Sequence, residues 1–236
     1  MPTSQPAPNH PEILRIVAPN PGPMTLTGTN TYVVGEGPAY VIDPGPEDEG
    51  HVAAIHSEVE RRGGLGGILL THSHADHAAA AWMLGASILQ SGPFQSISTP
   101  GHSQDHVCFV MDGVCFTGDL ILGEGSTFVP PTGGSLAAYL DSLHRVADLD
   151  VELLCPGHGP YVTDPATKVR EYIEHRMDRE RKLVAALESG ERSRARLLAA
   201  AWDDVPEEMR PAAAVVMQAH LEKLDAEGRL PDDLTD

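Results

Sequence analysis

The stretch Thr71-His72-Ser73-His74-Ala75-Asp76-His77 places four potential metal ligands within six residues. It follows the short apolar run Ile68-Leu69-Leu70, which predicts a buried strand that leads directly into the histidines. Residues two apart in an extended segment face the same way, so the first two histidines can bind one metal ion. The aspartate and the last histidine can then serve a second ion. The alternative, a solvated polar loop, is the weaker interpretation because such clusters rarely arise outside metal sites.

Three further positions complete a ligand set, and each lies beside glycine at the end of a predicted strand. They are Gly101-His102-Ser103, Gly118-Asp119 and Gly157-His158-Gly159. Each of them alone is more typical of a turn, but together with the first cluster they supply five histidines and two aspartates. Zinc favours nitrogen and oxygen ligands of this kind, and one carboxylate is left to bridge two ions.

Short apolar runs alternate with helical stretches before residue 163, and the pattern afterwards is almost entirely helical. We therefore expect a domain over residues 1–163 and a helical segment over 164–236. The expected strands are Thr31–Val34, Ala39–Ile42, Gly66–Thr71, His106–Met111, Val114–Thr117 and Val151–Leu154, and the expected helices are His51–Arg62 and Leu136–Val146. Asp112-Gly113 joins two of the strands and suits a type I′ hairpin turn.

Composition indicates a folded chain with an acidic surface. The 236 residues are 41% hydrophobic and carry a formal net charge of −18, which weakens attraction to nucleic acid and to anionic membranes. Residues Met1 to Pro11 are polar and proline-rich without an apolar signal segment, so we expect a cytoplasmic protein with no membrane partner. Cys108, Cys115 and Cys155 form no CxxC motif and are expected to be small buried hydrophobes.

The order HxHxDH, His, Asp, His resembles the metallo-β-lactamase superfamily. The resemblance implies that His72, His74 and His102 hold one zinc ion, that Asp76, His77 and His158 hold the other, and that Asp119 bridges them. It also implies a support role for Asp43 in Ile42-Asp43-Pro44-Gly45. Asn30 is a weaker candidate for a supporting or substrate-pocket residue. His106 could donate to a substrate, although a structural role is favoured.

Further motifs are similar to the branch that contains the endoribonuclease lactamase-β-like protein two. They are Gly28-Thr29-Asn30-Thr31-Tyr32, Thr99-Pro100-Gly101-His102, residues 118–125, Glu171–Arg176 and Leu221–Gly228. This resemblance implies an α/β, four-layer αβ/βα sandwich followed by a C-terminal helical, winged-helix-like segment. In one departure, only 24 residues separate His77 from His102 where the family usually has more, which predicts a missing cleft wall or sheet edge.

The resemblance implies a hydrolase with two zinc ions per chain, iron or manganese being alternatives. Zinc lowers the pKa of bound water enough to supply hydroxide near neutral pH, and Asp76 is placed to orient that hydroxide or to take its proton. Three functions stay open: an endoribonuclease acting on single-stranded RNA, a glyoxalase II-like thioesterase acting on a small acyl compound, and a mononuclear iron sulfur dioxygenase. The acidic surface opposes RNA affinity, and the absence of an export signal disfavours an antibiotic-degrading lactamase.

The predicted C-terminal helices carry apolar faces and a row of cations. The helical unit is consistent with a cap, a homodimer contact or a nucleic-acid-binding element. Its basic residues are Arg176, Arg179, Arg181, Lys182, Arg192, Arg194 and Arg196. They can contact phosphates, but the interspersed acidic residues favour a salt-bridged, solvated face.

Overall fold

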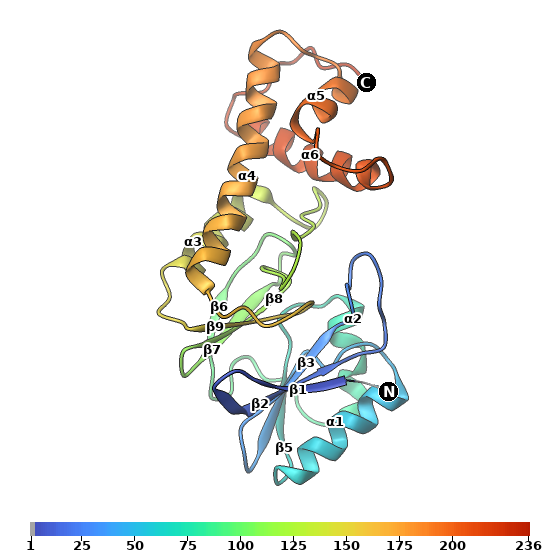
Figure 1. Ribbon diagram of the computed structural model, residues 1–236, viewed down its shortest axis with the longest axis vertical. Helices are drawn as coiled ribbons and strands as arrows, with labels where there is room; N and C mark the ends of the chain where they lie inside the picture. The colour runs from blue at the N-terminus through green and yellow to red at the C-terminus, as the bar shows by residue number, and fades with distance from the viewer. Residues whose placement is uncertain (1–2) are drawn as a thin grey trace.

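The computed structural model describes residues 3–236 and consists of two stacked β-sheets, flanking helices and a helical C-terminal unit (Figure 1). None of the helices in this range has the length and apolar character needed to cross a membrane. The N-terminal strands lie at one end of the elongated molecule and the last two helices, α5 and α6, lie at the other.

The first sheet has the strand order β1-β2-β3-β4-β5. Its strands are β1 (Thr3–Ala7), β2 (His10–Val17), β3 (Asn30–Val34), β4 (Ala39–Ile42) and β5 (Leu65–Leu69). The pairing of β3 with β4 is confirmed, and helix α1 (Glu49–Arg61) links β4 to its parallel neighbour β5. Strands β1 and β2 were not predicted. The N-terminal edge strand β1 is mostly exposed and contains proline, so it lacks the apolar alternation that signals a strand.

The second sheet has the order β6-β7-β8-β9. Its strands are β6 (Gln95–Ser98), β7 (Val107–Met111), β8 (Val114–Gly118) and β9 (Leu153–Pro156). The hairpin between β7 and β8 is confirmed, with a φ of 49° at Asp112 and 77° at Gly113, as a type I′ turn requires. Strand β6 was not predicted, because its polar residues lie on an exposed edge.

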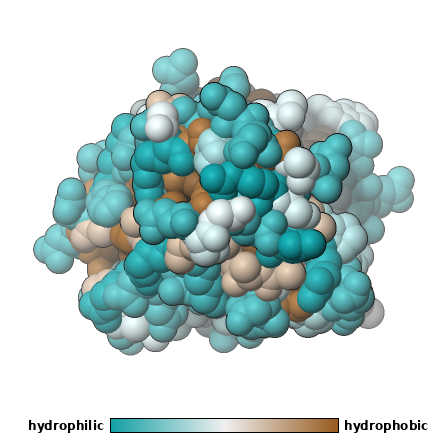
Figure 2. All heavy atoms as spheres, turned by 90° about the horizontal axis from the view of Figure 1, so that it is seen from above, coloured by the Kyte–Doolittle hydropathy of each residue, from teal (hydrophilic) through white to brown (hydrophobic). Residues whose placement is uncertain are grey.

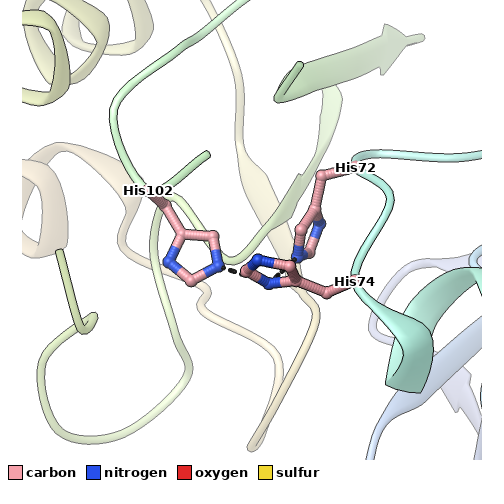
Figure 3. A group of neighbouring side chains, drawn as sticks. All are labelled: His72, His74 and His102. Carbon is pink, nitrogen blue, oxygen red and sulfur yellow. Dashed lines mark hydrogen bonds between the residues drawn. The ribbon is translucent and has the colours of Figure 1, made fainter. Parts of the chain in front are cut away.

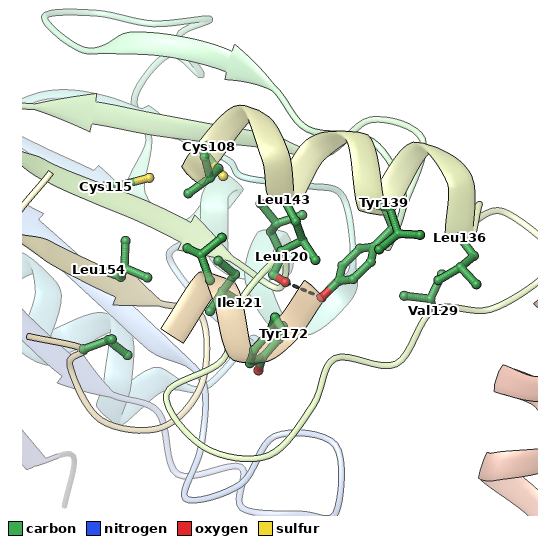
Figure 4. Close-up of a cluster of buried hydrophobic side chains, with 14 of the residues drawn as sticks. Cys108, Cys115, Leu120, Ile121, Val129, Leu136, Tyr139, Leu143, Leu154 and Tyr172 are labelled. Carbon is green, nitrogen blue, oxygen red and sulfur yellow. Dashed lines mark hydrogen bonds between the residues drawn. The ribbon is translucent and has the colours of Figure 1, made fainter. Parts of the chain in front are cut away.

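Alternating side chains divide the core into layers. Tyr32 and Val34 of β3 point between the sheets toward Phe116, while Val33 points outward to Val52 of α1. On the other side, α3 (Leu136–Ala147) packs on the second sheet, and the Tyr139 hydroxyl donates to the Leu120 carbonyl at 2.7 Å (Figure 4). The four-layer αβ/βα sandwich is therefore confirmed, and the three cysteines are free and buried as expected.

Helix α4 (Pro165–Glu188) belongs to two cores. Val169 and Tyr172 in its first half pack beside α3, whereas Leu183 and Leu187 in its second half pack with the C-terminal helices. Those elements are α5 (Arg194–Ala201), the short 3₁₀ helix η2 (Glu207–Met209) and α6 (Arg210–Ala226). The domain boundary at residue 163 stays a prediction, since one helix serves both units.

Candidate metal centre

All seven residues expected to bind metal meet at one end of the two sheets. His72 and His74 follow β5, and Asp76 and His77 lie in the short helix α2 (Ala75–Ala78). His102 lies between β6 and β7. Asp119 follows β8 and His158 follows β9, so the ends of three strands supply most of the site. The shortened segment between His77 and His102 still delivers both residues to it.

Three histidines form the first ligand group (Figure 3). The Nδ1 atom of His74 lies 3.0 Å from Nε2 of His72 and 3.0 Å from Nε2 of His102. His74 is exposed while the other two are buried, so the group opens toward solvent on one side. The three nitrogens converge on one point from two separate loops.

The second ligand group contains Asp76, His77 and His158. Nε2 of His158 lies 3.3 Å from Nε2 of His77 and 3.3 Å from Oδ2 of Asp76. Asp119 lies between the groups: its Oδ1 is 3.3 Å from Nε2 of His158, and its Oδ2 is 3.6 Å from Nε2 of His102. One carboxylate therefore faces both groups, as a bridging ligand must.

Hydrogen bonds on the outer side of the rings orient four of the five histidines. Nδ1 of His77 contacts Oδ2 of Asp43 at 2.9 Å, and Nδ1 of His102 contacts the Phe128 carbonyl at 2.8 Å. Nδ1 of His158 similarly faces the Gly28 carbonyl at 3.3 Å. Because these partners are acceptors, each Nδ1 carries the proton and each Nε2 presents its lone pair to the centre.

The contacts behind His72 also place its proton on Nδ1. The Thr71 hydroxyl donates to Oδ2 of Asp43 at 2.6 Å, so it can only accept at its 3.0 Å contact with Nδ1 of His72. The Thr71 amide also donates to Oδ1 of Asp43 at 2.7 Å. Asp43, 2% exposed, thus orients two ligand histidines, which matches its expected supporting role.

The donor set fits metal ions. Nitrogen and oxygen ligands around a tetrahedral zinc ion at ordinary bond lengths are about 3.3 Å apart, close to the spacings found in both groups. Oδ1 of Asp119 is buried and has no hydrogen-bond partner among residues 3–236. A buried carboxylate oxygen without a partner is costly, and a cation at this point would satisfy it.

The two groups differ in their electrostatic surroundings. Burial, reinforced by His77, lowers the pKa of His72 to about 2, which keeps this ring neutral and ready to bind metal. Burial also acts to lower the pKa of His158, but Asp119 and Asp76 outweigh it and raise the pKa to about 9.

The two remaining candidate residues, Asn30 and His106, make contacts that support the structure around the ligands. The Asn30 amide donates to the carbonyls of Pro156 and Gly159 at 2.8 Å each, and so holds the segment that carries His158. His106 is 1% exposed and lies behind His72, with Nδ1 at 2.8 Å from the Thr99 hydroxyl. It does not line the cleft described below, so the favoured structural role fits these contacts better than donation to substrate.

Sequence reasoning did not assign roles to Thr71 or Thr29. The Thr29 hydroxyl lies 3.5 Å from Oδ2 of Asp76 and accepts a hydrogen bond from the Asn20 amide at 3.0 Å. Both threonines lie within motifs already noted, but nothing in a local sequence shows which distant carboxylate a hydroxyl will meet.

Comparison with known proteins identifies the family. The sequence profile described as "Metallo-beta-lactamase superfamily" matches residues 24–88 and 89–158, and that of the "Beta-lactamase associated winged helix domain" matches residues 194–233. The chain belongs to the metallo-β-lactamase superfamily. The expected winged-helix-like character of the C-terminal segment is confirmed by the second match.

Several superfamily members resemble most of this chain. The Beta-lactamase-like protein 2 homolog of Drosophila melanogaster is 30% identical over 92% of this chain and 89% of its own length. The Lactamase-like protein adaB of Aspergillus niger is 36% identical over 79% of this chain, and the Atrochrysone carboxyl ACP thioesterase of Aspergillus chevalieri is 34% identical over 75%. This chain spans 66% of the length of each of these two fungal proteins, just under two thirds.

A solved structure supports the fold assignment. The crystal structure of a metallo-beta-lactamase family protein from Thermus thermophilus superposes with a TM-score of 0.71 at 22% identity, covering 94% of this chain and 95% of that one. The agreement therefore includes the C-terminal helices as well as the sandwich.

A cleft of about 600 Å³ leads from the superfamily's metal site to the C-terminal helices. His74, Asp76, His102, Asp119 and His158 lie at one end. The rest of the wall is largely apolar and comes from three regions: the loop with Met24 and Leu26, the loop with Phe128, and the helical unit; the last contributes Trp202, Val205, Met209, Ala212, Ala213 and Val216. A substrate in this cleft contacts both units of the chain.

The cations of the C-terminal unit are mostly neutralised by carboxylates. Six of the seven basic residues noted above form salt bridges: Arg179 with Asp204, Arg181 with Asp178, Lys182 with Asp203, Arg192 with Asp233, Arg194 with Asp236 and Arg196 with Glu191. The predicted salt bridges are confirmed for these six residues. The prediction of a solvated face is wrong for Arg176 and Arg179, which are buried, and Arg176 forms no salt bridge within residues 3–236. Figure 2 shows that this end of the molecule is mostly hydrophilic, with hydrophobic atoms visible between polar side chains.

Proposed function

We propose that this chain is a hydrolase with two zinc ions that cleaves the thioester bond of a small acyl substrate. The observation that carries the proposal is the cleft: the candidate ligands open into a space with a largely apolar wall. Such a wall suits an acyl chain and removes water from around it. The relative named as an acyl carrier thioesterase supports the same reaction class.

Two complete ligand groups with a shared carboxylate support two ions rather than one. A mononuclear iron dioxygenase of the superfamily keeps the same HxHxDH motif, so the metal content separates it from the hydrolase. Histidine nitrogen and carboxylate oxygen suit zinc, while iron and manganese also bind such donors. The choice of zinc therefore rests on donor chemistry and is tested by elemental analysis.

The residues around the centre divide the work of hydrolysis. When bound, zinc supplies Lewis acidity and lowers the pKa of water at the site. Asp76 is the ligand carboxylate more open to the cleft, with 30% of its side chain exposed against 13% for Asp119. Its carboxylate is thus placed to orient the attacking water and accept its proton. The hydroxyl of Thr29, which accepts a hydrogen bond from Asn20, contacts Oδ2 of this carboxylate and limits its rotation.

Hydrolysis of single-stranded RNA is the second candidate. The resemblance to the lactamase-β-like protein two branch and the Drosophila relative of that name favour it. The net charge of −18 and the salt bridges along the C-terminal unit oppose it, because phosphate binding needs cations that are not already paired. A cytoplasmic location and a homodimer also stay predictions from the sequence.

The test begins with metal content and continues with substrates. We expect about two zinc ions per purified chain, hydrolysis of a generic acyl thioester, and no cleavage of single-stranded RNA. His74→Ala and Asp119→Ala should abolish hydrolysis while the circular dichroism spectrum stays that of the folded chain. Unchanged hydrolysis in both variants would refute the metal mechanism, a single iron would support the dioxygenase, and cleavage of RNA alone would replace the thioester proposal.

A further inference from the structure

Arg176 is the member of the basic row that forms no salt bridge within the described residues. Its side chain is buried, with 2% of the residue exposed, and it lines the same cleft as the metal centre. The guanidinium lies over the Tyr139 ring, 5.3 Å from its centroid. A buried charge without a carboxylate partner is costly to a fold, so its presence in a cleft calls for a functional explanation.

The hydrogen bonds of Arg176 leave most of its donors free. Nη2 donates to the Thr127 carbonyl and, at 3.0 Å, to the Ser126 hydroxyl. Nε is buried without a partner, and Nη1 makes no hydrogen bond within residues 3–236. Only Nη2 thus has hydrogen-bond acceptors, and because both are neutral oxygens they do not balance the positive charge of the guanidinium.

Arg179 provides the contrast within the same helix. It also lines the cleft and is 5% exposed, but Nη1 and Nη2 bind both oxygens of Asp204 at 2.6 and 3.0 Å. Although Nε of both arginines is buried without a partner among residues 3–236, the charge of Arg179 is thus balanced by a carboxylate and that of Arg176 is not. General crowding of charge on α4 does not account for this difference.

The position of Arg176 suits contact with a substrate at the metal centre. Nη2 binds the carbonyl of Thr127, and the next carbonyl in the chain, that of Phe128, accepts from the ligand His102. Adjacent Cα atoms are about 3.8 Å apart, so guanidinium and ligand are anchored to neighbouring residues of one loop. Arg176 and the ligands also line one cleft, so a substrate that occupies it contacts both.

We propose that Arg176 binds an anionic group of the substrate, a carboxylate or phosphate, and thereby selects acyl thioesters that carry one. The inference rests on the proposed thioester hydrolysis. The anion has two sources: a carboxylate on the acyl part, or the phosphate of a pantetheine-type thiol carrier. In a cleft with low dielectric, a charge-assisted hydrogen bond to either is strong and selective.

The first experiment measures binding with three non-hydrolysable thioethers: S-hexyl-N-acetylcysteamine, its counterpart with a terminal carboxylate, and S-hexyl-4′-phosphopantetheine. Isothermal titration calorimetry on the zinc-loaded chain should show that one anionic probe binds about 10- to 100-fold more tightly than the neutral probe. The preferred probe identifies the source of the anion. Equal affinity for all three would overturn the proposal.

Variants then assign the preference to Arg176. Arg176→Gln should remove the preference while binding the neutral probe as the wild type does, and Arg176→Lys should retain part of it. Arg179→Gln, the matched control, should leave the ratio unchanged. Zinc content is measured in each variant, since equal loss of affinity for all probes together with loss of zinc would mean that Arg176 only supports the loop that holds His102.

Hydrolysis of the corresponding thioesters separates this inference from the proposed function. Hydrolysis without any preference would leave the proposed function standing and refute the role of Arg176. Preferential binding that depends on Arg176, without hydrolysis of any thioester, would support the anion site and refute the thioesterase.

Discussion

Replacing Asp43 with asparagine tests how the ligand histidines are oriented. Asp43 accepts from the Thr71 amide, the Thr71 hydroxyl and Nδ1 of His77 at 2.7, 2.6 and 2.9 Å. An asparagine in the same place keeps one acceptor oxygen but turns the other into an NH₂ donor. The Thr71 hydroxyl then has to donate toward His72, and His77 has to accept at Nδ1. Both rings would carry their proton on Nε2, facing the metals.

The expected loss of zinc affinity follows from the changed tautomers of His72 and His77. Loss of one hydrogen-bond partner behind a metal ligand typically lowers metal affinity about 10- to 100-fold, and here two ligands in different groups are affected. We expect Asp43→Asn to lose at least one zinc ion in competition with a chelator, because a ring that carries its proton on Nε2 has no lone pair there for the metal.

Asp112→Asn is a matched control for this change. Asp112 also has a positive φ, 49° against 51° for Asp43, but it lies in the hairpin turn, away from the metal centre. The Asp112→Asn variant should bind two zinc ions with wild-type affinity. The assay is chelator competition with elemental analysis, and a wild-type zinc affinity in Asp43→Asn would refute the tautomer reasoning.

Four further changes have defined outcomes. Gly157→Ala should lower metal content, because a Cβ there would lie 2.6 Å from Cε1 of His77 and 2.7 Å from Oδ1 of Asp119, whereas Gly50→Ala in α1 should not. Asp76→Asn should reduce kcat about 10²- to 10⁴-fold if this carboxylate handles the proton, measured at saturating zinc. Removal of metal by a chelator should lower the melting temperature of the wild type, because ligands of the folded state stabilise it, and should lower that of Asp119→Ala by less, because this variant lacks the carboxylate that both groups share. Burial, followed by the effect of Arg176, lowers the pKa of His220 to about 3, so the unfolded chain binds a proton at this histidine at a higher pH than the folded chain does. The free energy of unfolding is therefore unaffected by His220 above pH 6.5 and falls as the pH is lowered, by about 2 kcal/mol at pH 5. In urea unfolding at pH 7 and pH 5, His220→Phe should show a smaller loss between the two pH values than the wild type.

The centre of the fold was predictable because local signals agree with it. The strand before His72 is apolar, the Asp112-Gly113 turn fixes a hairpin, and several ligands follow a strand end next to glycine. Strands β1 and β6 were missed for the opposite reason. They are polar edge strands whose partners, rather than their own sequence, determine their conformation.

The ligand set was predictable and the contacts around it were not. Histidines and aspartates at strand ends stand out in the sequence, as do Asp43 and Asn30 through the resemblance. The tautomer-setting contact of Thr71 and the free guanidinium of Arg176 depend on residues brought together from distant segments. Sequence spacing holds no information on which of seven basic residues lacks a carboxylate neighbour.

Helix α4 gives the cleft a mechanical property. Its first half is embedded in the sandwich through Val169 and its second half in the helical unit through Leu183, so the two units are joined by a single continuous rod. A helix of this length is stiff, and rocking one unit against the other would require bending it or unpacking one core. The cleft between the two units therefore keeps a constant width. We expect this width to limit the cross-section of the molecules that enter the cleft.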